Sequence, residues 1–274
     1  MVAAPFWKRC STVTERVLVT RPAGQADRLC ALIEAAGAVA VRLPAIEIHD
    51  AGDSGQLESL LDQLDSFQLA VFVSVNAVEA GMPYILGRRQ WPAQVKLAAV
   101  GPTSTQAIER YGLCVDYVPK HEFSSEGLLA VDALQEMQDM NVVIFRGNGG
   151  RSKLYEGFTA RGARVVYAEV YSRSCPVMNF QDVIDVLQQD NLDIVTAASN
   201  ETLQNLFVMA GPQGQPLLRD KLLVVPGQRQ LELAEQLGFT KTPVVAGNAS
   251  DEAMMAALEK IIARKDAKAP RLRI

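Results

Sequence analysis

The sequence predicts an α/β protein of two similar domains, each a parallel sheet flanked by helices. Three observations predict this class. Short apolar runs alternate with segments of helical periodicity along the chain, which is typical of parallel strands connected by helices. The pattern recurs after 125 or 126 residues, as in Arg21 and Arg146 or Gly101 and Gly227. The length of 274 residues also suits two domains.

The first strand–helix–strand segment occurs in both copies. Val17–Thr20 is a short apolar run, and the Arg-Pro-Ala-Gly sequence that follows it breaks the strand. Apolar residues at helical spacing come next, and Gly37 suits the end of that helix. After this helix we expect a strand at Val39–Ile48. The second copy is expected to have a strand at Val142–Phe145, a loop at Arg146–Arg151, a helix from Ser152 capped by Gly162, and a strand at Arg164–Tyr171.

The remaining parts of the two copies also match. In the first copy we expect strands at Leu69–Val73, Lys96–Val100 and Cys114–Val118, with helices at Ala77–Met82, at Gln106–Tyr111 and from Ser124. In the second copy we expect strands at Asp193–Ala197, Leu222–Val225 and Val244–Ala246, with helices at Thr202–Met209, up to Leu237 and from Ser250. Parallel sheets bind ligands at the carboxyl ends of their strands, so the strand-to-helix loops are the expected binding site.

Composition excludes several classes of protein. The net charge of −4 gives no overall field that would attract nucleic acid or anionic lipid. No apolar run approaches the ~18–20 residues of a membrane span, and Met1–Arg16 lacks a secretory pattern. The cysteines form no Cys-x-x-Cys pair and are expected to be free thiols; they are Cys10, Cys30, Cys114 and Cys175. We therefore expect a cytoplasmic protein. A monomer is the default expectation, since no feature of the sequence bears on the oligomeric state.

Familiar catalytic motifs are missing from the sequence. There is no phosphate-binding Gly-x-x-x-x-Gly-Lys-Ser/Thr loop and no Gly-x-Ser-x-Gly elbow. Gly147–Gly150 matches a dinucleotide fingerprint loosely, because Ser152 stands where the third glycine belongs. Two histidines, His49 and His121, cannot make a His-rich metal site. These observations argue against hydrolysis, redox chemistry and metal catalysis.

Hydroxyl groups, backbone amides and arginines remain at the expected strand ends. The hydroxyl residues that precede expected helices are Ser74, Thr103, Ser104, Thr105 and Ser199, and the loop arginines are Arg21, Arg146, Arg151 and Arg229. Each hydroxyl suits helix N-capping, and each helix N-terminus also suits anion capture. Several such groups around one cleft would suit a ligand with several carboxylates.

Two tyrosines, Tyr167 and Tyr171, end an expected strand before a polar stretch. Such tyrosines commonly pack at a domain junction. A phenol can also donate a proton while it stays neutral at pH 7. Both interpretations remain open from the sequence.

In its order of short motifs the chain resembles the uroporphyrinogen-III synthase family. The segments that carry the resemblance are Val19–Pro22 with Gly37 and Pro44, Phe72–Val78, Ala99–Ser104, Ser124–Leu129, Arg161–Ala163 with Val170–Arg173, and Ser199–Leu206. They extend over most of the chain, and their order and spacing make the match specific.

The resemblance implies a fold in which the two copies exchange their first segments. One flavodoxin-like domain would comprise residues 1–46 and 174–274, and the other residues 47–173, joined by a two-stranded linker with the active-site cleft between them. A simple tandem duplication would instead divide the chain near residue 135.

The resemblance also implies an activity, a lyase reaction of tetrapyrrole (heme) biosynthesis. Linear hydroxymethylbilane would be cyclised to uroporphyrinogen III through a spiro intermediate, with inversion of ring D, loss of water and no cofactor. Tyr171 would be catalytic, by assisting departure of the hydroxyl. The substrate would be bound by Arg21, Ser74, Thr103, Ser104, Arg146, Gly147, Arg151, Ser199, Gly227, Gln228 and Arg229. The upstream bilane-forming enzyme is a further expected, transient partner; nucleic acid and membrane are not expected.

Two other classes of function remain open. Two α/β lobes with paired linkers also describe small-molecule binding or sensor modules, for which ligand binding without turnover would be decisive. A nucleotide-dependent transferase that uses Gly147–Gly150 is the other, and nucleotides would then shift its thermal stability.

Overall fold

The protein forms two compact units. The computed structural model describes residues 14–50 and 55–268, so most of the N-terminal segment that lacks a secretory pattern lies outside it. The first unit comprises the described residues of Met1–Glu47 and Ser174–Ile274, and the second comprises those of Ile48–Arg173. The chain thus passes from one unit to the other twice.

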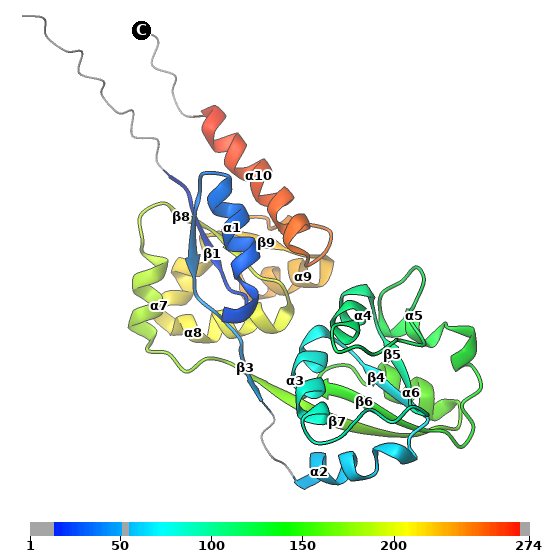
Figure 1. Ribbon diagram of the computed structural model, residues 1–274. Helices are drawn as coiled ribbons and strands as arrows, with labels where there is room; N and C mark the ends of the chain where they lie inside the picture. The colour runs from blue at the N-terminus through cyan, green and yellow to red at the C-terminus, as the bar shows by residue number, and fades with distance from the viewer. Residues whose placement is uncertain (1–13, 51–54, 269–274) are drawn as a thin grey trace, which may run out of the picture. The chain divides into compact units, whose positions relative to one another are not determined.

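The first unit is a parallel sheet with helices on both faces (Figure 1). Its strands are β1 (Arg16–Val19), β2 (Val39–Arg42), β8 (Leu192–Thr196), β9 (Leu222–Val225) and β10 (Val244–Val245). Its helices are η1 (Ala23–Gln25), α1 (Asp27–Ala35), α7 (Phe180–Leu187), α8 (Asn200–Arg219), α9 (Gln228–Leu237) and α10 (Asp251–Lys268). The strand order is β10-β9-β8-β1-β2, and each of these neighbouring pairs is parallel.

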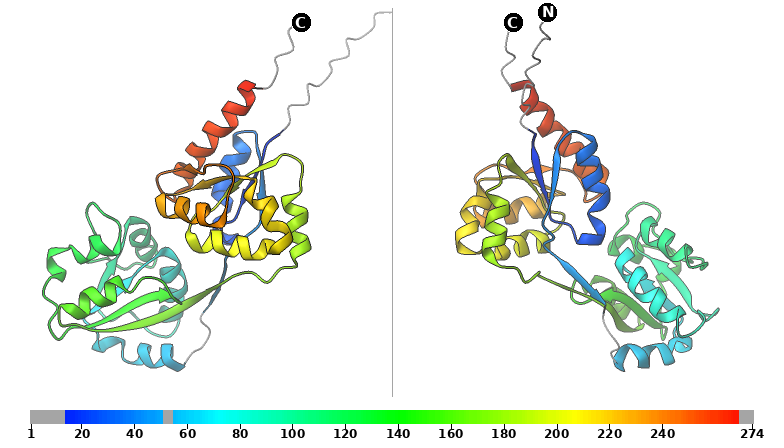
Figure 2. Two further views of the ribbon diagram at one scale, coloured as in Figure 1. Left: turned by 180° about the vertical axis from the view of Figure 1, so that it is seen from behind. Right: turned by 60° about the vertical axis from the view of Figure 1, so that its left-hand side comes forward.

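Strand β1 shows why this sheet needs two helical layers. Val17 and Val19 pack toward α1 and α10, whereas Leu18 packs toward α7 and α8. All three side chains are fully buried, so the strand is apolar without alternation. Figure 2 shows the same pairs of helices, α1 beside α10 and α7 beside α8, from two further sides.

The second unit repeats this architecture. Its strands are β3 (Glu47–Asp50), β4 (Leu69–Phe72), β5 (Lys96–Ala99), β6 (Asn141–Gly147) and β7 (Arg164–Ser174). Its helices are α2 (Gly55–Asp62), η2 (Leu64–Ser66), α3 (Val75–Leu86), α4 (Pro102–Glu109), α5 (Ser125–Leu129), η3 (Asp132–Leu134) and α6 (Lys153–Ala160). The order is β3-β7-β6-β4-β5, with parallel pairing from β7 to β5. The run β5-β4-β6-β7 corresponds to β9-β8-β1-β2 of the first unit.

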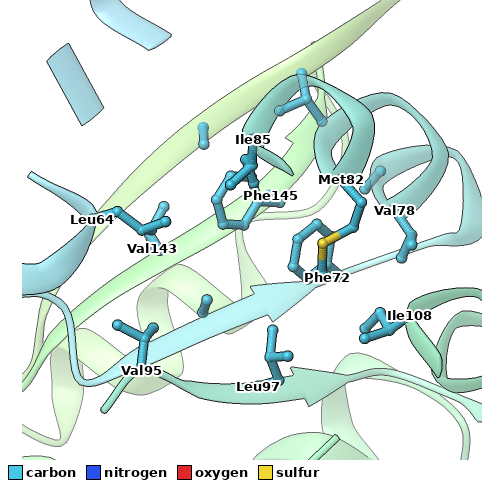
Figure 3. Packing of buried hydrophobic residues seen from close by; sticks show 14 of the residues in the cluster. Leu64, Phe72, Val78, Met82, Ile85, Val95, Leu97, Ile108, Val143 and Phe145 are labelled. Atoms are coloured by element: carbon cyan, nitrogen blue, oxygen red, sulfur yellow. The ribbon is translucent and has the colours of Figure 1, made fainter. Parts of the chain in front are cut away.

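Aromatic packing fixes the sheet of the second unit. The rings of Phe72 and Phe145, on β4 and β6, stack with centroids 4.5 Å apart. Met82 and Ile85 of α3 are buried in the same cluster, as Figure 3 shows. The carboxyl ends of β4 and β6 are thereby held next to one another, directly before the loops that carry the polar residues.

The predicted α/β class, with parallel sheets covered by helices, is confirmed. Several boundaries differ from the predictions. The single strand expected at Val39–Ile48 is two strands, β2 and β3, because Pro44 between them has no N–H to donate to a ladder. Cys114–Val118 contributes only an isolated bridge from Tyr117 to Ala98. Helices α2 and α7 were not expected from the sequence.

No helix in residues 14–50 and 55–268 is long and apolar enough to cross a membrane.

Candidate active site

A cavity of about 350 Å³ lies in the second unit at the carboxyl ends of its strands. Ser74 follows β4, Arg146 and Gly147 end β6, and Tyr171 lies near the end of β7. The lining comprises Val73, Ser74, Val100, Phe123, Ser124, Ser125, Ile144, Arg146, Gly147, Gly149, Gly150, Arg151, Leu154, Tyr167, Tyr171 and Arg173. Ser74, Arg146, Gly147, Arg151 and Tyr171, all expected site residues, therefore come together within one unit.

Arg146 is a buried cation without an anionic partner in the part of the chain that the structure describes. The residue is 7% exposed, its Nε donates to the Gly147 carbonyl at 3.1 Å, and its Cζ lies 4.3 Å from the centre of the Tyr167 ring. No carboxylate of the described residues lies within ion-pair distance of it. A buried, unpaired charge is costly, because its hydration is lost without compensation. A ligand carboxylate in the cavity would supply the missing partner.

The ring of Tyr171 is buried against Gly147. The register between β6 and β7 shifts after Arg146, so that Gly147 pairs with Tyr171 while Arg146 pairs with Glu169. A Cβ at Gly147 would lie 2.5 Å from two atoms of the Tyr171 ring, so only glycine leaves room for it. The bulge thus places a phenol that is 5% exposed at the wall of the cavity.

Ser74 has two neighbours. Its hydroxyl caps α3 by accepting from the Ala77 N–H at 3.2 Å, which confirms the expected N-cap. The same oxygen lies 3.5 Å from the Tyr171 hydroxyl, which is long for an O–H···O bond. Ser74 therefore borders the phenol without binding it tightly.

The loop after β6 carries the second arginine of the cavity. Gly149 and Gly150 have φ of +69° and +95°, a backbone conformation that favours glycine. Arg151 is exposed and lies 3.6 Å from the Glu126 carboxylate. The pKa of Glu126 is lowered, first by its own backbone N–H and then by the Ser124 hydroxyl and Arg151. Arg151 is thus partly neutralised, in contrast to Arg146.

Thr103 and Ser104 lie elsewhere than the sequence predicts. Both were expected in a loop before a helix at Gln106, but α4 already begins at Pro102 and its N-cap is Gly101. Proline suits a first helical turn, where its missing N–H costs nothing. Ser104 is buried and Thr103 exposed, and neither lines the cavity. Phe123 lies next to Gly101 instead, 56% exposed at the cavity wall.

The expected site residues of the first unit lie at its own strand ends. Arg21 follows β1, where it forms an ion pair with Asp251 at 3.0 Å and donates to the Ala249 carbonyl at 2.5 Å. Ser199 follows β8 and caps α8, accepting from the Thr202 N–H at 3.1 Å. The Ser199 cap is confirmed, and Arg21 is occupied by groups of its own unit.

Helix α9 begins beside the same strand ends. Gly227 is its N-cap, and Gln228 and Arg229 are exposed in its first turn. The buried Gln230 donates to the Asn200 side chain at 2.7 Å, which ties the first turns of α8 and α9 together. The N-termini that carry Ser199 and Gly227 are therefore neighbours within the first unit.

Comparisons with known proteins agree with one another. The sequence model of the family described as uroporphyrinogen-III synthase HemD matches residues 27–256. The uroporphyrinogen-III synthase of Escherichia coli (strain K12) is 31% identical over 247 residues, covering 89% of this chain and 99% of the relative. That of Salmonella typhimurium is 32% identical with the same coverage. The chain belongs to the uroporphyrinogen-III synthase family.

The fold agrees with a solved member of this family. The crystal structure of a mutant uroporphyrinogen III synthase from the extremely thermophilic bacterium Thermus thermophilus has a TM-score of 0.64, with 15% sequence identity. It covers 93% of this chain and is itself covered completely. The resemblance drawn from the short sequence motifs is thus confirmed as family membership.

The nucleotide-binding alternative finds no support at Gly147. A dinucleotide fingerprint needs its first glycine for the tight turn after the strand. In this member of the uroporphyrinogen-III synthase family the first glycine instead leaves room for the Tyr171 ring. Within the described residues no group of three or more His, Cys, Asp or Glu could hold a metal ion. Cys30, Cys114 and Cys175 are free thiols, and Cys10 lies outside the described residues.

Several residues of the cavity were not among the expected substrate contacts of the family resemblance. Among them are Phe123, Ser125, Tyr167 and Arg173. A signal for Tyr167 was present, because it precedes Tyr171 by four residues on one strand. No local pattern marks Phe123, because its exposure depends on how the segment after Tyr117 folds back over Gly101.

Proposed function

We propose that the chain cyclises linear hydroxymethylbilane to uroporphyrinogen III, with inversion of ring D and loss of water. The family match over residues 27–256, with relatives 31% and 32% identical over almost their whole length, carries the proposal. The chain is accordingly an enzyme of tetrapyrrole (heme) biosynthesis, a lyase.

The proposed reaction needs assistance to the departure of the bilane hydroxyl and precise positioning of ring D. The hydroxyl of the bilane takes up a proton and leaves as water, which gives an azafulvene. The substituted carbon of ring D attacks it to form a spiro intermediate. This intermediate fragments and recloses with ring D inverted, and the ring loses a proton, so that only water is lost overall. Holding ring D in the attacking pose is a proximity effect.

Tyr171 is the proposed donor to the departing hydroxyl. Its phenol lies at the cavity wall and carries an O–H group that can donate a hydrogen. Burial of the ring against Gly147 limits its rotation, which supports a fixed direction for the O–H. In this role Tyr171 speeds the loss of water but does not determine which isomer forms.

Carboxylate binding is proposed for the charged and polar residues of the cavity. Arg146 would take one carboxylate in its buried position, and Arg151 a second near the rim. Ser74 and Gly147 would border the same ring of the substrate. The uncompensated charge of Arg146 is the strongest support for an anionic ligand here.

The remaining substrate contacts are proposed at strand ends of both units. These residues are Thr103, Ser104, Ser199, Gly227, Gln228 and Arg229. The adjoining N-termini of α8 and α9 support an anion-binding role for Ser199 and Gly227, because the N-terminus of a helix carries a positive partial charge. For Arg21 the ion pair with Asp251 favours a structural role.

We also propose the exchanged two-domain arrangement. Two flavodoxin-like domains would be joined by a two-stranded linker and would enclose the substrate in the cleft between them. Support comes from the matching strand orders of the two units and from their boundaries after Glu47 and Arg173. Limited proteolysis tests the arrangement: a single cut near residue 135 that released two stable halves would contradict it.

The proposed substrate partner is hydroxymethylbilane, with a transient contact to the enzyme that forms it. A cytoplasmic monomer is proposed as well. Co-sedimentation of the two enzymes at micromolar concentration, and the sedimentation coefficient of this chain alone, would test these two points.

One experiment tests the activity directly. The protein is supplied with enzymatically generated hydroxymethylbilane, and the type I and type III isomers are separated by chromatography. Spontaneous closure gives the type I isomer, without inversion, so accumulation of type III with added protein is the expected result. Type I alone, at the rate seen without protein, would refute the proposed function.

A further inference from the structure

The Arg146 guanidinium is fixed from several sides within the second unit. The Tyr167 ring lies under it at 4.3 Å, inside the range of a cation–π contact. The Gly147 carbonyl accepts from its Nε at 3.1 Å. Near its Nη2, a Cβ at Gly150 would come within 2.9 Å, so the loop after β6 passes close to the cation. Its other N–H groups have no acceptor among the described residues.

The side chain of Tyr167 is held in place by contacts of its ring. It pairs with Ile144 in the register of β6 and β7, and its ring packs on the Tyr155 ring with centroids 5.2 Å apart. The Tyr167 hydroxyl is closed off from solvent and has no hydrogen-bond partner in the described part of the chain. A buried, unsatisfied hydroxyl is destabilising. The presence of a tyrosine at position 167 is therefore explained by the contacts of its ring, because its hydroxyl makes no stabilising hydrogen bond.

The first unit holds the equivalent arginine by a different means. Arg21 precedes Arg146 by 125 residues, and at the same spacing Arg42 stands in the place of Tyr167. Arg21 is paired with Asp251, a carboxylate that both orients and neutralises it. An aromatic ring orients a guanidinium without cancelling its charge. A cation held in this way stays available to an anionic ligand.

We propose that Tyr167 is a positioning residue for substrate binding. Its ring orients Arg146 in the cavity without neutralising it, so that Arg146 can bind one carboxylate of the bilane. This inference rests on the proposed function, since it assigns a carboxylate of that substrate to Arg146. Tyr167 acts through Arg146 and takes no part in the bond changes.

The test compares three single variants and a double variant by their KM for enzymatically generated hydroxymethylbilane. Tyr167→Phe keeps the ring and should leave KM within about twofold. Tyr167→Met fills similar space without a π face and should raise KM by about three- to tenfold, with kcat close to that of the wild type. In an Arg146→Gln background, Tyr167→Met should raise KM no further.

Two patterns of raised KM would overturn the inference. If Tyr167→Phe raised KM as much as Tyr167→Met, the hydroxyl and not the ring would act. If Tyr167→Met raised KM by the same factor with and without Arg146, the effect would not pass through Arg146. Should Tyr167→Met fail to fold, the exposed Tyr155→Leu replaces it: it removes the ring that supports Tyr167 and should raise KM by a smaller factor, again only when Arg146 is present.

Failure of the proposed function would look different. In that event the wild-type protein forms no type III isomer, which is seen before any variant is compared and overturns both proposals. When type III forms but KM is unchanged in Tyr167→Met, the function stands and the role of Tyr167 falls.

Discussion

Arg21 and Arg146 lie at the carboxyl ends of equivalent strands of the two units, yet their surroundings differ. Arg21 has the Asp251 carboxylate at 3.0 Å and the Ala249 carbonyl at 2.5 Å. Arg146 has the Tyr167 ring and the Gly147 carbonyl, and no carboxylate of the described residues. The repeat has thus kept the position of the arginine and changed its charge balance. An arginine whose charge is compensated within its unit stabilises the fold, and one whose charge is not compensated can bind an anion.

The neighbours of the two arginines differ in the same sense. At the spacing of 125 residues, Tyr171 corresponds to Ile46, a buried aliphatic residue. Gly147, which leaves room for the Tyr171 ring, corresponds to Pro22. The second unit therefore carries the groups able to donate a proton and bind a carboxylate, while the equivalent places of the first unit carry packing groups.

Replacement of Tyr171 should have the largest effect on catalysis. In Tyr171→Phe we expect kcat to fall by about a hundredfold, because assistance to the leaving hydroxyl is lost. The ratio of type III to type I product formed by the enzyme should not change. Ile46→Val at the equivalent place should leave kcat at the wild-type value. Steady-state kinetics and separation of the isomers measure kcat and the product ratio of both variants. If Tyr171→Phe had the wild-type kcat, Tyr171 would take no part in the chemistry.

Replacement of Arg146 should weaken substrate binding, whereas replacement of Arg21 should lower stability. Arg146→Gln should raise KM about tenfold or more, the loss expected for a hydrogen bond to a charged group. Arg21→Gln should change KM by less than about twofold but lower the melting temperature by a few degrees, because Asp251 loses its cation. Kinetics and thermal unfolding of both variants measure the contrast. A larger effect of Arg21→Gln than of Arg146→Gln on KM would contradict the different roles of the two arginines.

The sequence predicted those parts of the fold that depend on local pattern. Strand β9 was expected at Leu222–Val225 and is found there. Ser74 and Ser199 were expected as N-caps and have almost identical cap geometry, with φ of −162° and −155°. Strand and cap signals lie within a few residues of one another, so the repeat could be followed without knowledge of the tertiary structure.

Features of the candidate site that depend on tertiary contacts were missed. The partner of Arg21 is 230 residues away at the start of α10, and no local pattern joins Arg21 to Asp251. The register shift opposite Gly147 depends on how two strands pair, and it decides that the Tyr171 ring meets Gly147. Thr103 was misplaced because the helix was expected only from Gln106, whereas α4 begins at Pro102, a residue that suits the first turn of a helix.

Replacement of either capping serine should lower the free energy of unfolding by a similar amount, but the two replacements should differ slightly in their effect on kcat. Ser74→Ala and Ser199→Ala should each lower the free energy of unfolding by about 1 kcal/mol, since each removes one N-cap. Only Ser74 also lies near the Tyr171 hydroxyl, at 3.5 Å, so only Ser74→Ala should reduce kcat, by less than about threefold. Denaturant unfolding and kcat of both variants measure this. An equal loss of kcat in Ser199→Ala would place that serine, too, beside the reacting groups.

The smallest expected difference between the two units concerns Glu126 and Glu252, which are 126 residues apart. Glu252 is ion-paired with Arg28 on the surface of the first unit. Glu126 lies beside the cavity, and its lowered pKa, caused first by its own backbone N–H, means that the folded state favours the carboxylate. This contribution to stability is present above the unfolded pKa and is lost as pH falls through the folded pKa.

Glu126→Gln should therefore lower the melting temperature slightly at neutral pH, and the difference from wild type should vanish on acidification. The same change frees Arg151, so KM should fall or stay constant, whereas Glu252→Gln should leave KM unaltered. Melting curves from about pH 7 to about pH 3, with KM at neutral pH, measure both. A rise of KM in Glu126→Gln would mean that the Glu126 carboxylate, and not the cation it neutralises, serves the substrate.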